Sequence, residues 1–252
     1  MLILISPTKT LNFVQNISGL AETKPLFFDK SASLVNVIAG MSLAQIKTIF
    51  KLSDMLSQKT FNEYQDWSVT DIQNPAIYSY AGTVFDKMNP SQFSLEDMQF
   101  AQLHLCIIDG LYGLLRPMDM IKRYRLEMNT KIPLHGFKNL YAFWCDLITS
   151  YLQTQLCQSD YIINLASKEY FKAIKFEDLN VLVITPTFAE WSNGVLKTKA
   201  TYAKQARGLM VAFCIKNQIE NPNDLKLFNQ EGYEFSETHS NKNNFVFIRK
   251  SQ

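Results

Sequence analysis

Short apolar runs separated by long segments of helical character constrain the fold of this chain more than any other feature. Each run is a few residues long and is bounded by polar or small residues. The runs read LILIS from Leu2, LHLCIIDG from Leu103, YIINLAS from Tyr161, VLVITPTF from Val181 and NFVFIRK from Asn244. Such runs are typical of buried strands, the fourth of which should end at its proline. Their alternation with helices predicts an α/β or mixed α+β fold, with a partly buried central sheet flanked by helices.

The helical segments carry start and stop signals of their own. The segment 42–67 predicts two helices broken near Leu52–Asp54, with Ser42 and Ser53 as N-caps. Other helices are predicted after Ser94, whose partner Asp97 completes a capping box, over 140–152, over 168–174, and over 198–220 before Asn221-Pro222. No repeat or linker interrupts the chain, so we expect one domain spanning residues 1–252.

Composition excludes several classes of protein. The formal charge of +2 over 252 residues gives no global sign of a polyanion partner. Four widely spaced cysteines, with no CxxC and no signal peptide, predict a cytoplasmic protein with reduced thiols. No apolar run approaches a membrane span. The three histidines, His104, His135 and His239, lack metal-ligand spacing, so we expect neither a metal nor a cofactor.

Polar residues follow three of the predicted strands at once. The stretches ISPTKT, IIDGLYG and INLASKEY each turn from apolar residues to small, polar and charged ones. Ligand sites gather where the strands of helix-covered sheets hand over to loops. We therefore expect these three strand ends to share one site.

The first of them, residues 2 to 10, leaves several interpretations open. A Lys-Thr pair after a buried strand is how a phosphate-binding loop ends, but this stretch has no glycine and Pro7 removes a donor. Ser6 and Lys9 fit the S-x-x-K spacing of a nucleophile pair, without its companion motifs. The remaining interpretations are a capping serine with a solvated lysine, or a lysine, with Thr10, that contacts an anion.

Basic residues are clustered in two segments. Lys122, Arg123 and Arg125 surround Tyr124, shortly after Arg116, and the planar fork of arginine suits phosphate. The stretch from Trp191 to Ile219 has no acidic residue but includes Lys204 and Arg207, which share a helix face. Segregated charge of this kind is the footprint of a polyanion binder, although a solvated basic surface explains it as well.

The third strand end opens onto a short basic helix. Asn164 and Ser167 lie at its start, and Lys168 and Lys172 would reinforce the affinity of a helix N-terminus for anions. Glu169 either complements the helix dipole or acts as a general acid or base with Glu127 or Asp109. Spacing does not decide whether these carboxylates meet.

Taken together, several stretches make the chain resemble the peroxide stress protein YaaA family. They are LILISPTKTL, GLYGLLRPMDMIKRYRLEM, LYAFWCDLI, INLASKEYF, YAKQARGLM and FNQEGYEF, which run in order to about Tyr233. Thr8 and Gln205 depart from the family pattern, which has alanine and lysine there. The resemblance implies an unusual mixed α/β fold, a cytoplasmic bacterial protein, resistance to peroxide, limitation of iron-dependent damage, and DNA binding in a positively charged cleft. It also implies a helix-hairpin-helix element, for which 42–65 is the best match, although no glycine lies at its turn.

The predicted function is therefore largely sequence-independent DNA binding, to duplex or partly unpaired DNA, with Tyr124 or Tyr170 available to stack on a base. The residues expected to contact DNA are Lys9, Thr10, Arg116, Lys122, Arg123, Tyr124, Arg125, Lys168, Tyr170, Lys172, Lys204 and Arg207. The resemblance also brings Ser6, Asp119, Glu127, Asn164 and Ser167 to the cleft, and these are the candidate catalytic residues. The alternative is an enzyme that acts on a nucleotide or nucleobase in the same cleft, whereas direct iron binding is disfavoured by the lack of ligand spacing.

Overall fold

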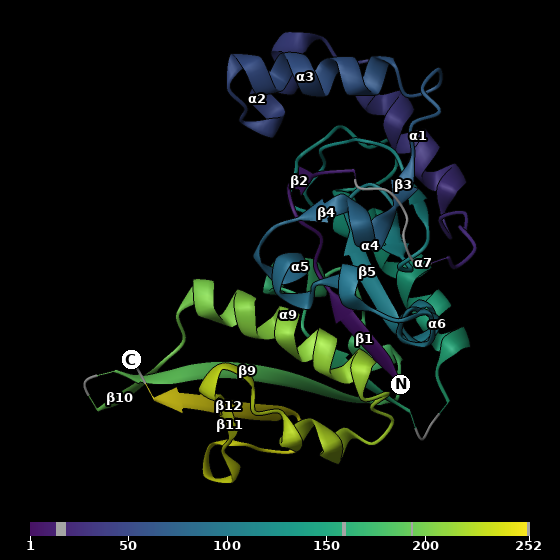
Figure 1. Cartoon of the computed structure of the whole chain (residues 1–252). Helices are drawn as coiled ribbons and strands as arrows, with labels where there is room; N and C mark the ends of the chain where they lie inside the picture. Colours follow the sequence, from purple (N-terminus) through teal and green to yellow (C-terminus); the bar gives the residue numbers. More distant parts are fainter. Residues whose placement is uncertain (14–18, 158–159, 193, 251–252) are drawn as a thin grey trace.

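A single mixed sheet runs through the protein from its first strand to its last (Figure 1). The computed structural model describes residues 1–13, 19–157, 160–192 and 194–250. The strand order is β11-β12-β9-β8-β1-β5-β6, with β10 added beside β9. The strands are β1 (Leu2–Ile5), β5 (Leu105–Asp109), β6 (Gly113–Leu115), β8 (Tyr161–Asn164), β9 (Leu182–Ser192), β10 (Val195–Lys197), β11 (Glu234–Phe235) and β12 (Asn244–Lys250). The predicted mixed α/β fold with a central sheet is confirmed.

The centre of the sheet is parallel. Strand β1 pairs in parallel with β5 on one side and β8 on the other, and β8, β9 and β12 continue in parallel. All four residues of β1 and all five of β5 are buried, as expected of parallel strands covered on both faces. The short strands β6, β10 and β11 are antiparallel to their neighbours.

The prediction that the fourth run ends at its proline is wrong. Strand β9 continues through Pro186, which pairs with Phe245 of β12. The backbone N–H of Thr185 points toward β12, where it donates to Asn243 at 2.8 Å. The nitrogen of Pro186 therefore faces the opposite side, where the pairing of β8 has already ended at Ile184. The missing donor costs no ladder bond there.

Helices cover the sheet and extend above it (Figure 1). They are α1 (Phe28–Ala39), α2 (Leu43–Phe50), α3 (Asp54–Gln65), α4 (Ala76–Ser79), α5 (Thr83–Met88), α6 (Leu95–His104), α7 (Leu140–Gln155), α8 (Lys168–Phe171) and α9 (Ala200–Lys216). Two-residue ribbons pair β2 (Thr10–Leu11) with β4 (Tyr80–Ala81) and β3 (Asn74–Pro75) with β7 (Met120–Ile121).

The predicted caps of these helices are confirmed. Ser42 and Ser94 each form a full capping box, and Ser53 accepts the backbone N–H of Leu56. The turn between α2 and α3 places Lys51 in the left-handed region, at φ 54°. Helix α6 runs on to His104, so β5 begins two residues later than the apolar run.

Among the described residues, no single helix is long and apolar enough to cross a membrane. Helices α1 and α2 meet the length and composition criteria only as a pair, and they are bent by 114° at their junction.

Candidate functional site

The three polar strand ends do lie at one edge of the sheet. Strands β5, β1 and β8 are adjacent and parallel, so their C-terminal ends lie at the same edge of the sheet. Asp109 and Asn164 are the last residues of β5 and β8, and Ser6 comes directly after β1. Ser6 Oγ accepts the backbone N–H of Ser167 at 2.9 Å, which joins the first strand end to the third. Lys9 Nζ lies 2.7 Å from Glu127 Oε2, which joins the first to the long connection between β5 and α7, the connection that includes β6 and β7.

The side chain of Asp109 is the buried centre of this edge. Its Oδ1 accepts the backbone N–H groups of Leu111 and Tyr112, each at 2.8 Å. Its Oδ2 accepts the hydroxyl of Tyr80 at 2.9 Å and also that of Tyr124, and the two hydroxyl oxygens are 2.9 Å apart. Burial raises the pKa of Asp109, and these four hydrogen bonds oppose that rise. We call Asp109, Tyr80 and Tyr124 the buried triad.

Close packing holds the loop after β5 against this triad. A Cβ at Gly110 would lie 2.3 Å from the carbonyl oxygen of Leu126, so the backbone can return this closely only beside glycine. The indole of Trp144 donates to the Gly110 carbonyl at 2.9 Å. The Tyr64 hydroxyl donates to the Arg125 carbonyl at 3.0 Å, which attaches the same loop to α3.

A cleft of about 120 Å³ opens between β2, α3 and the end of this loop. We call it the basic cleft, and its lining residues are Lys9, Thr10, Leu11, Leu56, Lys59, Thr60, Glu63, Arg123, Tyr124 and Arg125. Its volume equals that of about four water molecules, at ~30 Å³ each. A second hollow of about 280 Å³ shares Lys59, Glu63 and Arg123 with it and continues along α3.

Positive charge exceeds negative charge in the basic cleft. Four cationic side chains face one carboxylate, Glu63, while Glu127 pairs with Lys9 from outside. Burial raises the pKa of Glu63, and the charges of Lys59 and both cleft arginines oppose that rise. Arg123 donates to the Leu11 carbonyl at 3.2 Å and lies over the ring of Phe13. Within the described parts of the chain, the guanidinium of Arg125 has no ion pair or hydrogen bond.

The carboxylates whose meeting the sequence left open do converge. The negative charge of Glu127 contributes to a raised pKa of Glu169, after the larger effect of burial. Burial also raises the pKa of Tyr170, and the charges of Asp109, Glu169 and Glu127 add to it in that order. Glu169 also accepts the backbone N–H of Asn129 at 3.3 Å. Glu127 and Glu169 are therefore close enough for their charges to interact.

Several predicted residues have other roles in the structure. Arg116 holds the fully buried Asp119, with Nη2 2.9 Å from Oδ1, and therefore serves the loop itself. Lys122 donates from Nζ to the Trp67 carbonyl at 2.8 Å. Neither residue lines the basic cleft.

The expected stacking of Tyr124 or Tyr170 on a base conflicts with their burial. Their side chains are 7% and 9% exposed, and the ring of Tyr124 packs edge-on against Tyr112. Stacking on a base requires an open ring face, which neither has.

The basic residues of the other two predicted helices do not line the basic cleft. Lys168 and Lys172 are exposed on α8 and just after it, but this helix has four residues and its Ser167 N–H is already bonded to Ser6. On α9, which packs against α5 and β9, Lys204 is exposed and Arg207 is half-buried, and neither lines the basic cleft. Asn164 donates to Thr185 at 3.3 Å and accepts from Ala166 at 3.1 Å, so it shapes the strand end.

Reasoning from the sequence missed Tyr80, Lys59, Thr60 and Glu63. The α3 residues repeat at helical spacing, so the face Leu56-Lys59-Thr60-Glu63 is readable once α3 is known to cover a site. Nothing local marks Tyr80, because its partner Asp109 is distant in sequence.

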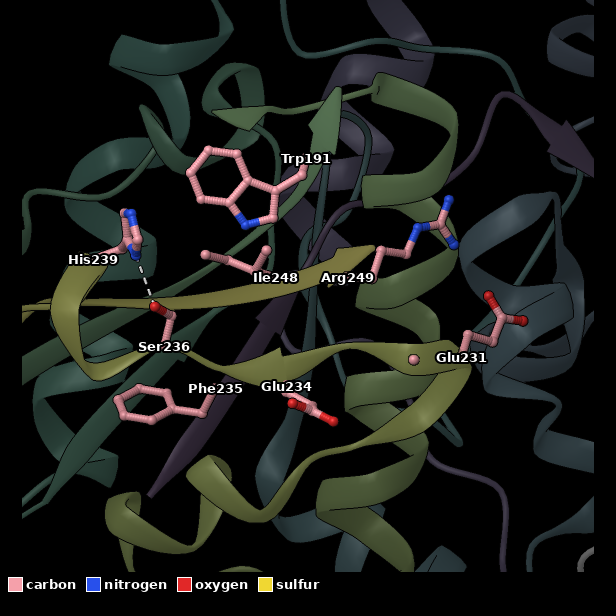
Figure 2. Close-up of a pocket in the computed structure, with 9 residues that line it drawn as sticks. Trp191, Glu231, Glu234, Phe235, Ser236, His239, Ile248 and Arg249 are labelled. Carbon is pink, nitrogen blue, oxygen red and sulfur yellow. Dashed lines mark hydrogen bonds between the residues drawn. The ribbon is translucent and has the colours of Figure 1, made fainter. Parts of the chain in front are cut away.

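A larger hollow lies elsewhere, beside β11 and β12 (Figure 2). It measures about 800 Å³, but its charged groups are mostly paired with neighbours. Arg249 pairs with Glu190, Glu231 pairs with Lys87, and His239 is hydrogen-bonded to Ser236. No residue predicted from the sequence lines it, so we place the functional site at the basic cleft.

Among the described residues, no group of three or more His, Cys, Asp or Glu side chains is arranged to hold a metal ion. The cysteines Cys106, Cys145, Cys157 and Cys214 are all free thiols.

Fold and site define a class of mixed α/β protein in which a buried carboxylate–tyrosine cluster lies beside a cationic cleft at the strand ends. The family model of the peroxide stress protein YaaA matches residues 1–239. The chain belongs to this family. It is 40% identical to a UPF0246 protein of Ralstonia nicotianae, over the full length of both chains. It is also 40% identical to a UPF0246 protein of Saccharophagus degradans, over 99% of this chain and all of the relative, and 38% identical to one of Aliivibrio fischeri, over all of this chain and 99% of the relative.

Proposed function

We propose that this peroxide stress protein binds DNA through the basic cleft, contacting phosphates largely without regard to sequence. The observation that carries the proposal is Arg125, whose guanidinium is half-buried in the cleft and forms no ion pair or hydrogen bond with the described residues, although its charge acts on Glu63. An arginine fork in this position is suited to two oxygens of a phosphate. Because the Arg125 guanidinium forms no ion pair within the described chain, it is available to bind an anion from outside the protein.

The neighbouring groups support a phosphate rather than a carboxylate ligand. Lys9 and Lys59 extend from opposite walls and are mostly exposed, so both can reach a backbone that passes across the cleft. The hydroxyls of Thr10 and Thr60 add hydrogen-bond donors on the same walls. The second hollow along α3 would let a strand of DNA continue past the cleft.

Helix α3 forms one wall of the cleft, and the pair α2–α3 covers the segment proposed as a helix-hairpin-helix element. Its turn has Lys51 where a glycine is expected, and its contribution to the cleft comes from α3 side chains. In this proposal the pair grips DNA mainly through side chains. By covering DNA in the bacterial cytoplasm, the protein would limit the iron-dependent oxidative damage that accompanies peroxide.

The test is fluorescence anisotropy with labelled duplex and bubble-containing DNA over a salt series. Each phosphate contact contributes about −0.9 to the slope of log K against log salt. Arg125→Ala should weaken binding at low salt and make the slope shallower by about one, whereas Arg125→Lys should retain most of it. Lys216→Ala, on the exposed end of α9, is the matched control. An unchanged slope in Arg125→Ala would contradict the proposal.

A second candidate function is an enzyme that acts on a nucleotide. It is favoured by the convergence of Glu127 and Glu169 beside Tyr170, which a simple phosphate clamp does not need. Nucleosides and nucleotides incubated with the protein, and analysed by chromatography, would reveal turnover. Product formation that disappears in Glu169→Gln, while DNA affinity is retained, would establish the enzyme. A stress phenotype lost only with the cleft cations would exclude it.

A further inference from the structure

Tyr124 connects the basic cleft with a buried proton acceptor. Tyr124 is one of the residues that line the cleft, and its hydroxyl donates to Asp109 Oδ2 in the interior. The hydroxyl of Tyr80 lies 2.9 Å from both the Tyr124 hydroxyl and the same carboxylate oxygen. The phosphate-binding proposal uses none of these three buried groups. Four hydrogen bonds offset the cost of burying the Asp109 carboxylate, and two of them come from phenols.

Phenols lose an electron far more readily when their proton can leave at the same time. A carboxylate already hydrogen-bonded to the hydroxyl is a suitable acceptor, and a backbone carbonyl is not, because it does not take up a proton near neutral pH. Tyr64 donates to the Arg125 carbonyl, and Tyr112 accepts the backbone N–H of Lys122. Tyr124 therefore differs from these neighbouring tyrosines in having both a carboxylate acceptor and a place in the cleft wall.

We propose that Tyr124, with Asp109 as its proton acceptor, donates one electron to an oxidised base of DNA held in the basic cleft. This inference rests on the proposed DNA binding. The oxidant is a guanine radical cation, the product of one-electron oxidation of DNA by species formed from peroxide. The protein would then reverse damage to the DNA that it covers, in addition to shielding it.

The step balances as one electron and one proton. The guanine radical cation gains an electron from Tyr124 and becomes guanine. The O–H bond of Tyr124 breaks, and its proton moves along the existing hydrogen bond to Asp109 Oδ2, leaving a neutral phenoxyl radical and a neutral carboxylic acid. Tyr80 can then turn its hydroxyl proton to the phenoxyl oxygen at 2.9 Å. Each chain supplies one electron before it must be reduced again.

The surrounding aromatic groups favour leaving the radical on Tyr124. The rings of Tyr112 and Trp67 follow it at centroid distances of 5.3 Å and 6.2 Å, so migration is geometrically possible. However, the ammonium of Lys122 lies 5.9 Å from the Trp67 ring, where it disfavours a positive charge on the indole. Tyr112 lacks a carboxylate for its proton in the described network.

The experiment uses the full-length protein bound to a duplex that carries a tethered photo-oxidant. Guanine oxidation is measured as strand cleavage after alkaline treatment, and the protein radical is measured by electron paramagnetic resonance. DNA affinity is measured for every variant, and each complex is compared at saturation. The wild type should spare about one guanine per bound chain and show a tyrosyl radical, formed more slowly in D₂O. Tyr124→Phe should lose both the protection and the radical, whereas Tyr202→Phe, on α9 and outside the basic cleft, should keep them.

Asp109→Asn provides the second arm, because it removes the proton acceptor and leaves the phenol in place. Radical formation should fall several-fold and lose its solvent isotope effect, provided that circular dichroism shows a folded protein. Equal guanine damage in the wild-type and Tyr124→Phe complexes would overturn the inference while leaving DNA binding intact. Absence of binding at low salt would instead overturn the proposed function, and with it the DNA substrate of this step.

Discussion

Lys9, just past the end of β1, and Glu127, in the segment between β7 and α7, form an ion pair with 2.7 Å between Nζ and Oε2. In this pair, the carboxylate of Glu127, which does not itself line the basic cleft, partly neutralises the charge of Lys9, which does. The lysine is 61% exposed and its partner 22%, so the pair is reached by solvent and is weak in stability terms. Its main consequence is therefore the charge that the cleft presents to an anionic ligand.

Glu127→Gln should strengthen DNA binding. Removing the carboxylate frees Lys9 for a phosphate, which should steepen the dependence of log K on log salt by up to about 0.9. Anisotropy titrations at several salt concentrations measure this slope. Glu177→Gln, at an exposed position away from the cleft, is the control and should change nothing. Weaker binding by Glu127→Gln would mean that the carboxylate serves the ligand instead of opposing it.

Gly110→Ala should destabilise the protein and weaken DNA binding together. The added Cβ would lie 2.3 Å from the Leu126 carbonyl oxygen, so the loop that carries Arg125 must move. Overpacking of this kind costs about 1–3 kcal/mol of unfolding free energy, measurable by denaturant titration. Gly40→Ala is the matched control, because its Cβ would meet backbone atoms no closer than 3.5 Å. Equal stability of the two variants would contradict the packing argument.

Local features of this fold could be predicted from the sequence because their causes lie within a few residues. The caps at Ser42, Ser53 and Ser94 depend on side chains that reach neighbouring backbone, and the buried strands depend on their own apolar runs. The common location of the three strand ends could also be predicted from the sequence, since neighbouring parallel strands end at the same edge of a sheet. The passage of β9 through Pro186 could not be predicted, because it depends on where β8 stops pairing with β9.

The site was predicted only in part, for a related reason. Lys9, Thr10, Arg123 and Arg125 do meet in one cleft, as their clustered charge indicated. The link between Asp109 and Tyr80 depends on sheet order and could not be read locally. Arg116 is a different case, because its acidic partner three residues on was visible in the sequence and explains its structural role.

Asp109→Asn should change the pH dependence of stability. Burial raises the pKa of Asp109 in the folded state, so the folded protein binds this proton more tightly than the unfolded chain. The unfolding free energy of the wild type should therefore fall as pH rises from the ordinary Asp value through the raised one. Denaturant titrations over this pH range should show that the unfolding free energy of the wild type falls relative to that of Asp109→Asn as the pH rises.

Asp71→Asn, at an exposed position, serves as the control for this measurement and should track the wild type at every pH. A wild-type advantage that grows with pH would show that the four hydrogen bonds to the Asp109 carboxylate outweigh its desolvation.

Arg116→Ala and Arg125→Ala should give opposite results, which would separate a structural arginine from a ligand-binding one. Arg116 neutralises Asp119, which is fully buried and also accepts the Thr23 hydroxyl at 2.6 Å and the Arg116 backbone N–H at 2.8 Å. Removing the guanidinium leaves an uncompensated buried charge, at a cost of about 3–5 kcal/mol of unfolding free energy. Arg125→Ala removes no such partner and should leave stability within about 0.5 kcal/mol of the wild type.

DNA binding should reverse this order. At a temperature where Arg116→Ala is folded, its salt slope should match the wild type, whereas that of Arg125→Ala should be shallower by about one. The double variant Arg116→Met/Asp119→Asn checks the cause, because removing both charges should recover much of the lost stability. A shallower salt slope in folded Arg116→Ala would show that this arginine also reaches a phosphate, and the loop would then belong to the DNA-binding surface itself.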